Sequence, residues 1–218
     1  MDENVYMHSI NNSPVNYFST KEAKRVLIRI LKCNALLSRR MQGFSTNGGF
    51  NGEDYISLSD YSKRDIVNNG KKNYNAYNGY IRCGVSLAFD KDQVSVIEPE
   101  IIDICTTNYR DYYLMKELGL EEERYSDLPD EVFVKDILPL DSLKYITFPV
   151  DEYFESRLYF SKKSKIKHLK EEIEELKQIL RQYNYFTDIY DIDSKILLNE
   201  EGIENLVLKN NVDKHEIK

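Results

Sequence analysis

The sequence predicts an α+β fold, because strand-like and helix-like apolar patterns both recur along the chain. Alternation with a period of two is clearest at residues 131–135, where Val132 and Val134 fall on one face. A helical spacing of three and four is clearest at residues 166–183. With 218 residues, the chain can bury a core as one domain, or as one domain with an appendage.

The first half of the chain is predicted to contain one helix among several short strands. Residues 4–10 form the first expected strand, and a capping box at residues 19–22 begins a helix that runs to about residue 38. The polar, tyrosine-rich residues 60–78 are expected to be irregular. Three further strands are expected, at residues 55–59, 80–89 and 93–97, with a turn at residues 90–92 joining the last two.

The second half of the chain is predicted to change from strands to helices. Residues 108–118 have a helical pattern. A hairpin is expected next, in which the strand at residues 131–135 is followed by a second apolar strand at residues 145–148. Residues 151–183 are expected to be helical, and residues 185–218 to form a small apolar appendage with a charged tail.

The long C-terminal helix carries an apolar stripe that allows two interpretations. It forms a coiled-coil homodimer through residues 164–183, or it packs against its own domain, and its short length favours the second. We expect the chain to divide into a domain at residues 1–150 and a C-terminal helical appendage with a tail at residues 151–218. The stripe consists of Ile166, Leu169, Ile173, Leu176, Leu180 and Tyr183.

Charge and cysteine content argue against several classes of function. The net charge of −7 and the pI of about 5.2 argue against a protein that holds nucleic acid mainly by electrostatic attraction. Cys33, Cys83 and Cys105 are far apart, so neither a disulfide framework nor a metal site is expected. Residues 1–20 contain no visible secretory signal, and no apolar run reaches the ~20 residues of a membrane span. We therefore expect a cytoplasmic protein with no membrane partner.

One carboxylate stands at the start of the strand at residues 131–135. Taken alone, Glu131 is expected to be solvated at a sheet edge, because Asp and Glu are mostly exposed, and the alternative is a carboxylate held in a cleft for chemistry. Its surroundings read DEVFV at residues 130–134, followed by LPLDSLKYI at residues 138–146. This stretch resembles the catalytic-glutamate region of ADP-ribosyltransferases, especially the bacterial toxin-like group that includes the DNA-thymidine-modifying enzymes.

Two further segments support this resemblance, which covers about residues 4–150. The family opens with a strand that ends in His and a small hydroxyl residue, as does VYMHS at residues 5–9. A helix and a passage ending in Ser-Arg follow in the family, matched here by NALLSR at residues 34–39. The resemblance implies an ADP-ribosyltransferase-like two-sheet core with an N-terminal helix and a long C-terminal helix. It also implies a cleft that binds NAD as a substrate, without a metal.

The resemblance implies roles for residues at two of these segments. Glu131 is implied as the catalytic residue beside the nicotinamide ribose, where loss of nicotinamide passes through an oxocarbenium-like transition state. Asp130 competes for this role, and only one of the two can face the cleft, since successive strand residues point to opposite faces. His8 is implied to bind a ribose hydroxyl, with Ser9 helping to hold the amide end of NAD. The alternative for His8 is a cap on a strand edge.

Arg39, Tyr55 and Ser57 complete the implied NAD site. A guanidinium suits a pyrophosphate, and the alternative is that Arg39 and Arg40 complement the dipole at a helix end. The strand at residues 55–59 is implied to face the nicotinamide pocket, where Tyr55 stacks on the ring beside the hydroxyl of Ser57. Other tyrosines are open alternatives for this stacking, namely Tyr61, Tyr74, Tyr77 and Tyr80.

The departures from the family leave the acceptor open. The chain has no Ser-Thr-Ser triplet followed by Glu-x-Glu, so the resemblance is to the His-first branch, and NGGFNG at residues 47–52 lacks the spacing of a dinucleotide-binding fingerprint. The leading hypothesis is an ADP-ribosyltransferase-like enzyme that cleaves NAD and modifies a protein or nucleic acid, as a toxin or effector. Alternatives are a non-catalytic binding module of the same fold that acts through a protein partner, and a protein that sequesters a nucleotide.

Overall fold

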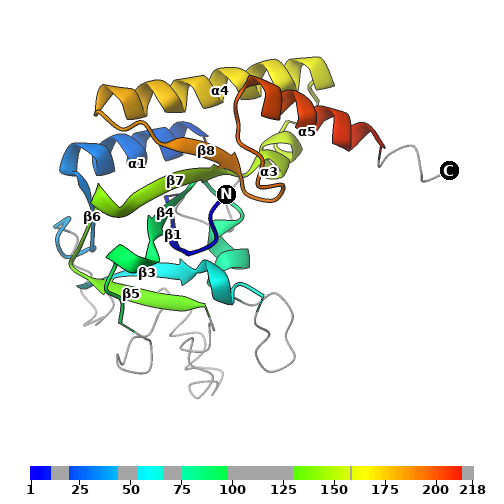
Figure 1. Cartoon of the computed structure of the whole chain (residues 1–218). Coiled ribbons are helices and arrows are strands. Elements are labelled where there is room, and N and C mark those ends of the chain that lie inside the picture. The colour runs from blue at the N-terminus through cyan, green and yellow to red at the C-terminus, as the bar shows by residue number, and fades with distance from the viewer. Residues whose placement is uncertain (11–19, 44–53, 66–74, 98–129, 158, 213–218) are drawn as a thin grey trace, which may run out of the picture.

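The computed structural model describes residues 1–10, 20–43, 54–65, 75–97, 130–157 and 159–212. At its centre is a six-stranded sheet in the order β5-β3-β1-β4-β7-β8 (Figure 1). Neighbouring strands are antiparallel, except that β7 and β8 are parallel. A two-stranded sheet pairs β2 (Ala35–Leu37) with β6 (Ile137–Pro139). The strands of the large sheet are β1 (Val5–Ser9), β3 (Tyr55–Asp60), β4 (Ser86–Asp90), β5 (Glu131–Lys135), β7 (Leu143–Phe148) and β8 (Asp188–Asp191).

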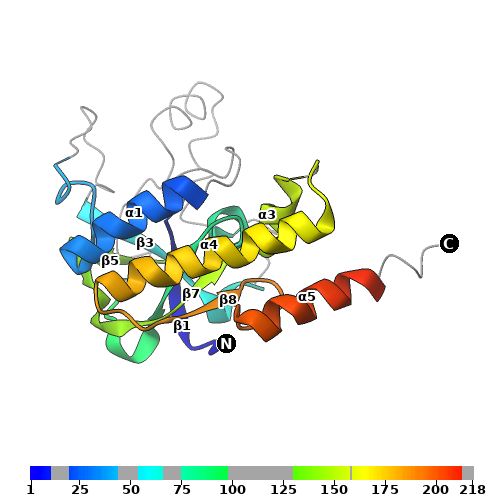
Figure 2. The same ribbon diagram turned by 90° about the horizontal axis from the view of Figure 1, so that it is seen from above.

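Two helices lie side by side over one face of the large sheet (Figures 1 and 2). They are held together by Lys24 of α1, whose Nζ is 2.7 Å from a carboxylate oxygen of Glu172 and 2.6 Å from one of Glu175, both on α4. Together with the mainly antiparallel strands, the helices confirm the α+β class. The helices are α1 (Thr20–Cys33), α3 (Val150–Glu155), α4 (Lys162–Gln182) and α5 (Glu200–Val212).

The main hydrophobic core fills the space between the sheet and these helices. Alternate strand residues point into it, because successive side chains of a strand point to opposite faces. They meet buried residues of α1 and α4, and the shared cluster includes Tyr6, Leu58, Leu87, Val132, Ile146, Leu27, Leu31, Leu169 and Leu176. A smaller cluster covers the opposite face near the start of β1 and contains Val5, Met7, Ala88, Tyr145, Tyr61 and Tyr77.

The first helix is shorter than predicted, and the expected end near residue 38 is wrong. α1 ends at Cys33, and Asn34 adopts a left-handed conformation with a φ of 53°. Asn tolerates this conformation better than most residues, so it stops the helix. The following residues then pair with β6 as β2, with Leu36 opposite Leu138.

Three strand predictions also require correction, whereas the strands expected at residues 4–10 and 55–59 are confirmed. Residues 77–81 form a π-helical turn, η3 (Tyr77–Ile81), so the strand predicted from residue 80 begins only at Ser86. After β4, the side chain of Asp90 accepts the N–H of Asp92 and caps the 3-10 turn η4 (Lys91–Gln93), so no strand forms at 93–97 beyond a bridge between Ile97 and Phe133. β5 and β7 form no hairpin, because β5 pairs with β3 and β7 with β4.

The helix predicted at residues 151–183 is divided into α3 and α4. Ser161 caps the start of α4, where its hydroxyl accepts the N–H of Ser164 at 3.3 Å. Most of the apolar stripe of α4 is buried within the chain, as the own-domain interpretation predicts, and the homodimer through residues 164–183 stays a prediction. β8 extends the sheet beside β7, so the described residues before and after residue 150 share one sheet and one core.

Some predictions concern residues outside the part of the chain that the structure describes. The helix expected at 108–118, the first residue of the capping box, Ser19, and Cys105 all fall there. Cys33 and Cys83 are free thiols. Across the described ranges, no helix is both long and apolar enough to cross a membrane.

Candidate functional site

Three adjacent strands carry most of the predicted site residues. In the order β5-β3-β1, Glu131 lies opposite Ser59, and Ser59 lies opposite Met7. The strand period of two puts Tyr55, Ser57 and Ser59 on the same face as Glu131. Their neighbours Ile56, Leu58 and Val132 point to the main core, so this polar face is the one turned away from α1 and α4.

Glu131 is a buried carboxylate with one unpaired oxygen. Its Oε1 accepts a hydrogen bond from the hydroxyl of Ser57 at 2.5 Å, and Glu131 as a whole is only 6% exposed. Its Oε2 is buried and has no hydrogen-bond partner among the described residues. The interpretation of Glu131 as a solvated edge residue is therefore wrong. Burial raises the pKa of Glu131 to about 7, a shift that the Ser57 hydrogen bond opposes and the nearby charge of Asp130 reinforces.

Asp130, the competing carboxylate, has a structural role instead. It is fully buried, and its two side-chain oxygens accept three hydrogen bonds. The donors are the hydroxyl of Ser59 at 2.6 Å and the backbone N–H groups of Ala76 and Tyr77, both at 2.8 Å. Asp130 therefore ties the start of β5 to β3 and to the segment that leads into η3, whereas Glu131 keeps one buried oxygen without a hydrogen-bond partner among the described residues.

His8 is held in a defined tautomer beside Ser57. Its Nδ1 lies 2.8 Å from the backbone oxygen of Ser57. A carbonyl oxygen only accepts hydrogen bonds, so Nδ1 carries the proton in this contact. Burial lowers the pKa of His8, which keeps the ring neutral near pH 7. The neutral ring therefore has an unprotonated Nε2 that can accept a hydrogen bond.

Ser57 contacts both groups, since its carbonyl accepts from His8 and its hydroxyl donates to Glu131. The strand period of two nevertheless places His8, opposite Leu87, on the face of the main core with Tyr6, and not on the face that carries Glu131. Tyr55 lies on the same face, with its ring edge-on to Phe133 at a centroid distance of 6.3 Å. Ser9 is half-buried at the end of β1, opposite Ser86 of β4.

Arg39 lies away from this group. It is exposed in the turn after β2, where the adjacent Ser38 donates its N–H to the backbone oxygen of Asp136 at 2.8 Å. Asp136 directly follows β5 and is five residues beyond Glu131, which amounts to about 16 Å along an extended strand. The neighbouring Arg40 pairs with Asp54 at 2.6 Å.

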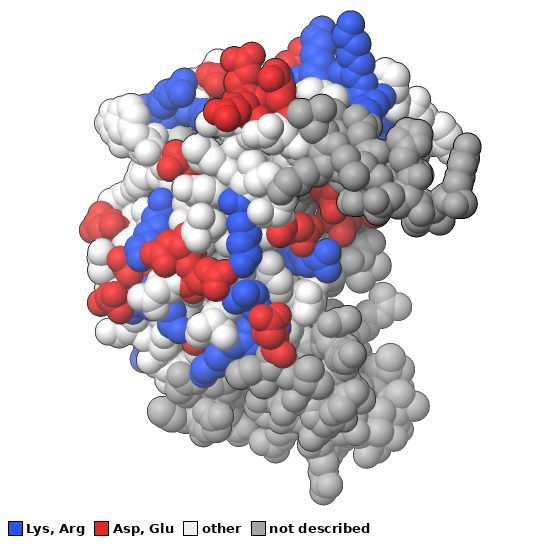
Figure 3. Space-filling model, turned by 45° about the vertical axis from the view of Figure 1, so that its right-hand side comes forward, with Lys and Arg blue, Asp and Glu red and all other residues white. Residues whose placement is uncertain are grey.

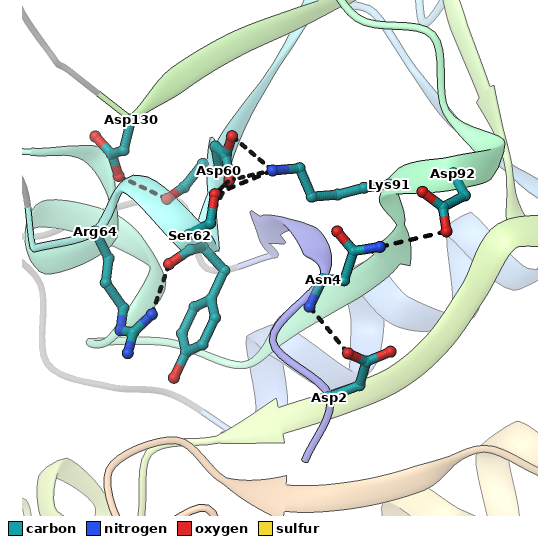
Figure 4. Close-up of polar contacts among 10 residues, drawn as sticks. Asp2, Asn4, Asp60, Ser62, Arg64, Lys91, Asp92 and Asp130 are labelled. Atoms are coloured by element: carbon teal, nitrogen blue, oxygen red, sulfur yellow. Dashed lines mark hydrogen bonds and ion pairs between the residues drawn. The ribbon is translucent and has the colours of Figure 1, made fainter.

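A second polar network, which the sequence did not predict, supports the end of β3 (Figure 4). The Nζ of Lys91 lies 2.7 and 2.8 Å from the two carboxylate oxygens of Asp60, and Asp60 also accepts the hydroxyl of Ser62 at 2.6 Å. The backbone N–H of Asp60 donates to the backbone oxygen of Asp130 at 2.6 Å. The partners Asp60 and Lys91 are 31 residues apart, and no local pattern links them.

The arrangement suits a ligand that brings hydrogen-bond donors. Glu131 Oε2 and His8 Nε2 are acceptors, and buried polar atoms normally have partners. Within the described ranges, no group of three or more His, Cys, Asp or Glu residues is placed to hold a metal ion. Comparison with protein-family models, curated proteins and solved structures finds no significant match for this chain, so the family resemblance of residues 4–150 stays a prediction.

Proposed function

We propose that this chain is an ADP-ribosyltransferase-like enzyme that cleaves NAD at the nicotinamide–ribose bond and transfers ADP-ribose to a macromolecular acceptor. The observation that carries the proposal is the contact of three residues from separate segments through Ser57. His8 and Glu131 both bind Ser57, and Glu131 retains a buried oxygen that has no partner among the described residues.

The proposed reaction breaks the bond between the nicotinamide nitrogen and C1′ of the ribose. The bonding electrons leave with neutral nicotinamide, positive charge develops on the ribose, and an acceptor oxygen or nitrogen then bonds to C1′ and loses its proton. Ribose hydroxyls are donors, so one suits Glu131 Oε2 and another suits His8 Nε2. The ionised carboxylate of Glu131 stabilises the developing positive charge, and its raised pKa makes it a suitable base near neutral pH.

Two of the remaining proposed contacts belong to the strand face that also carries Glu131. Tyr55 is the proposed stacking partner of the nicotinamide ring, and Ser9 the proposed contact of its amide. Arg39 is the proposed contact of the pyrophosphate, which requires the dinucleotide to extend along β5 towards Lys135. A toxin or effector role acting in a cytoplasm belongs to the same proposal, and the acceptor, protein or nucleic acid, is to be identified by experiment.

The test is release of labelled nicotinamide from NAD by the whole chain. Glu131→Gln should lower the rate by at least about 100-fold, because a group acting on the transition-state charge is lost while the shape is kept. Glu201→Gln, at an exposed position of α5, is the matched control and should retain the parental rate. Cleavage by Glu131→Gln at the parental rate would refute the assignment.

Two further measurements separate the proposal from its alternatives. Titration calorimetry with NAD at millimolar concentration should detect binding, and its absence would favour the non-catalytic binding module. Mass spectrometry of proteins and nucleic acids incubated with labelled NAD should then detect an ADP-ribosyl adduct. Nicotinamide release without any adduct would identify a hydrolase instead of a transferase.

A further inference from the structure

The loop between α3 and α4 lies at an outer corner of the molecule (Figure 2) and carries an exposed aromatic pair. The Tyr159 residue is fully exposed and Phe160 is 50% exposed. The ring of Phe160 is fixed by an edge contact with His168 at a centroid distance of 5.7 Å. Three exposed lysines, Lys162, Lys163 and Lys167, follow on the first turns of α4. We call these five residues, Tyr159, Phe160, Lys162, Lys163 and Lys167, the basic corner.

The charge of this region contrasts with that of the chain as a whole. Residues 156–170 contain no Asp or Glu but carry Arg157, Lys162, Lys163, Lys165, Lys167 and Lys170, whereas the whole protein has a net charge of −7. Lys and Arg side chains stand out at this end of the molecule, as Figure 3 shows. A positive field with exposed rings at its centre complements an anionic surface that can also accept apolar groups.

Not all of these cations are available to a partner. Arg157 lies over the ring of Tyr153 at 3.7 Å, and Lys165 donates to the backbone oxygen of Phe154 at 3.0 Å. Lys170 pairs with Glu204 at 2.9 Å. Lys163 is exposed, and Lys167 has only a long ion pair with Glu171, at 3.8 Å. The exposed cations of the corner are therefore all lysines.

We propose that the basic corner docks the protein onto an anionic phospholipid surface. Tyr and Phe side chains favour the boundary between water and acyl chains, and lysines near such a surface are attracted by its negative potential. The contact needs no membrane-spanning helix, and it revises the expectation of no membrane partner.

Two observations favour a lipid surface over a nucleic acid. The loop that carries the two rings stands at an outer corner of the molecule in Figure 2, which suits entry into a soft surface, whereas single-stranded nucleic acid is usually bound along a groove. The exposed cations are lysines, which act as point charges, and the arginine that suits phosphate recognition is stacked on Tyr153. A polyanion that followed α4 beyond the corner would also meet Glu171, Glu174 and Glu175, all exposed.

The experiment measures binding of the whole chain to vesicles by flotation. Vesicles of phosphatidylcholine with about one-third phosphatidylserine should bind the protein at low salt, and vesicles of phosphatidylcholine alone should bind it at least about tenfold more weakly. Lys163→Gln with Lys167→Gln should weaken binding about 25-fold, since each lysine near an anionic surface is worth about fivefold. Tyr159→Ser should weaken it about fivefold through lost ring burial, and its full exposure in the structure leaves the fold undisturbed.

A matched control has the same change in charge elsewhere. Lys21→Gln with Lys32→Gln, both exposed on α1, should bind vesicles as the parent does. Equal weakening by the two lysine pairs, or equal binding to neutral and anionic vesicles, would overturn the proposal. So would competition by soluble phosphoserine, which indicates a free-phosphate site, or binding of a labelled single-stranded oligonucleotide through the same residues without vesicle binding. Vesicle binding does not depend on NAD cleavage, so failure of this proposal leaves the proposed function untouched.

Discussion

The hydroxyl of Ser57 donates to Oε1 of Glu131 at 2.5 Å, across the neighbouring strands β3 and β5. Two residues further along β3, Ser59 makes the same kind of contact with Asp130, at 2.6 Å. The two acids nevertheless differ in their surroundings. Asp130 has two further donors from the backbone, whereas Glu131 has none among the described residues for its second oxygen. Two carboxylates that are adjacent in sequence thus divide into one that accepts three hydrogen bonds and one that keeps a buried oxygen without a partner among the described residues.

Replacing Glu131 should stabilise the protein at alkaline pH. The pKa of Glu131 is about 7 in the folded state, above its ordinary value of 4.5, so folding favours the protonated form. Its contribution to stability is present at low pH and is lost as the pH rises from about 4.5 to 7. The Glu131→Gln protein should match the parent near pH 4.5 and exceed its free energy of unfolding by up to about 3 kcal/mol at pH 8. Urea denaturation at both pH values measures this, and an equal difference at the two would contradict it.

Replacing Ser57 should move the pH dependence of catalysis upward. The Ser57 hydrogen bond lowers the pKa of Glu131, so Ser57→Ala should raise that pKa further. Because the proposed role uses the ionised carboxylate, the parental rate of NAD cleavage should rise with pH through about 7, and the variant should need a higher pH to reach half of its maximal rate. Initial rates between pH 5.5 and 9 measure both midpoints.

Ser59→Ala is the matched control for this comparison, because it removes a hydroxyl from the same face of the same strand. Ser59 binds Asp130, so its loss should leave the kinetic midpoint where it is and lower the free energy of unfolding by about 1–3 kcal/mol. A midpoint that moves equally in both variants would indicate a general effect of β3 instead of the specific contact with Glu131.

Replacing Asp130 should destabilise the fold strongly. In Asp130→Asn, an amide NH₂ replaces one carboxylate oxygen at a fully buried position. The NH₂ is a donor, so it cannot accept the hydrogen bonds that Ser59 and the backbone N–H of Tyr77 now donate. We expect a loss of about 3 kcal/mol in the free energy of unfolding, because hydrogen bonds to a charged group are lost without replacement. Asp141→Asn, at an exposed position, should change it by less than about 0.5 kcal/mol. Similar effects of the two changes on urea denaturation would show that Asp130 is not a structural anchor.

The sequence predicted those strands and helices whose apolar pattern alone shows which face is buried, whatever element packs against that face. The alternation in β1 and β3 and the spacing of three and four in α4 follow from which faces are buried. The boundaries failed where one residue decided the outcome, as at Asn34, whose left-handed conformation ends α1 before the apolar pattern ends. The strand predicted at residues 93–97 failed because the side chain of Asp90 caps the turn η4 there, and only Ile97 reaches a strand, at Phe133 of β5.

The candidate site was predicted through the resemblance, and its supporting residues were not. His8, Ser57 and Glu131 were proposed from separate segments, and the structure joins them through Ser57. The role of Asp130 depends on Ser59, 71 residues earlier in the chain. A sequence pattern carries no information on such a pairing until the strand order is known. The exposed position of Arg39 likewise depends on a long-range pairing, because the chain leaves α1 after Cys33 and pairs with β6 as β2.

Removing the C-terminal residues should unfold the remainder of the chain. α4 contributes five buried apolar side chains to the core, and four of these residues are no more than 2% exposed. The five are Leu169, Ile173, Leu176, Ile179 and Leu180. At about 1.5–3 kcal/mol each, their burial amounts to roughly 7–15 kcal/mol, which is comparable to the whole stability of a typical domain. A chain ending at residue 150 should therefore lack a cooperative unfolding transition by circular dichroism.

Single substitutions in the whole chain test the same packing without truncation. Leu176→Ala should lower the free energy of unfolding by about 2–5 kcal/mol, since it leaves a cavity between α4 and the sheet. Glu174→Ala, at an exposed position of the same helix, should lower it by less than about 0.5 kcal/mol.

If the chain ending at residue 150 is instead monomeric and unfolds cooperatively, then residues 1–150 form an independent domain. In that case α4 and β8 are an appendage that adds stability without being required for the sheet that holds His8, Ser57 and Glu131.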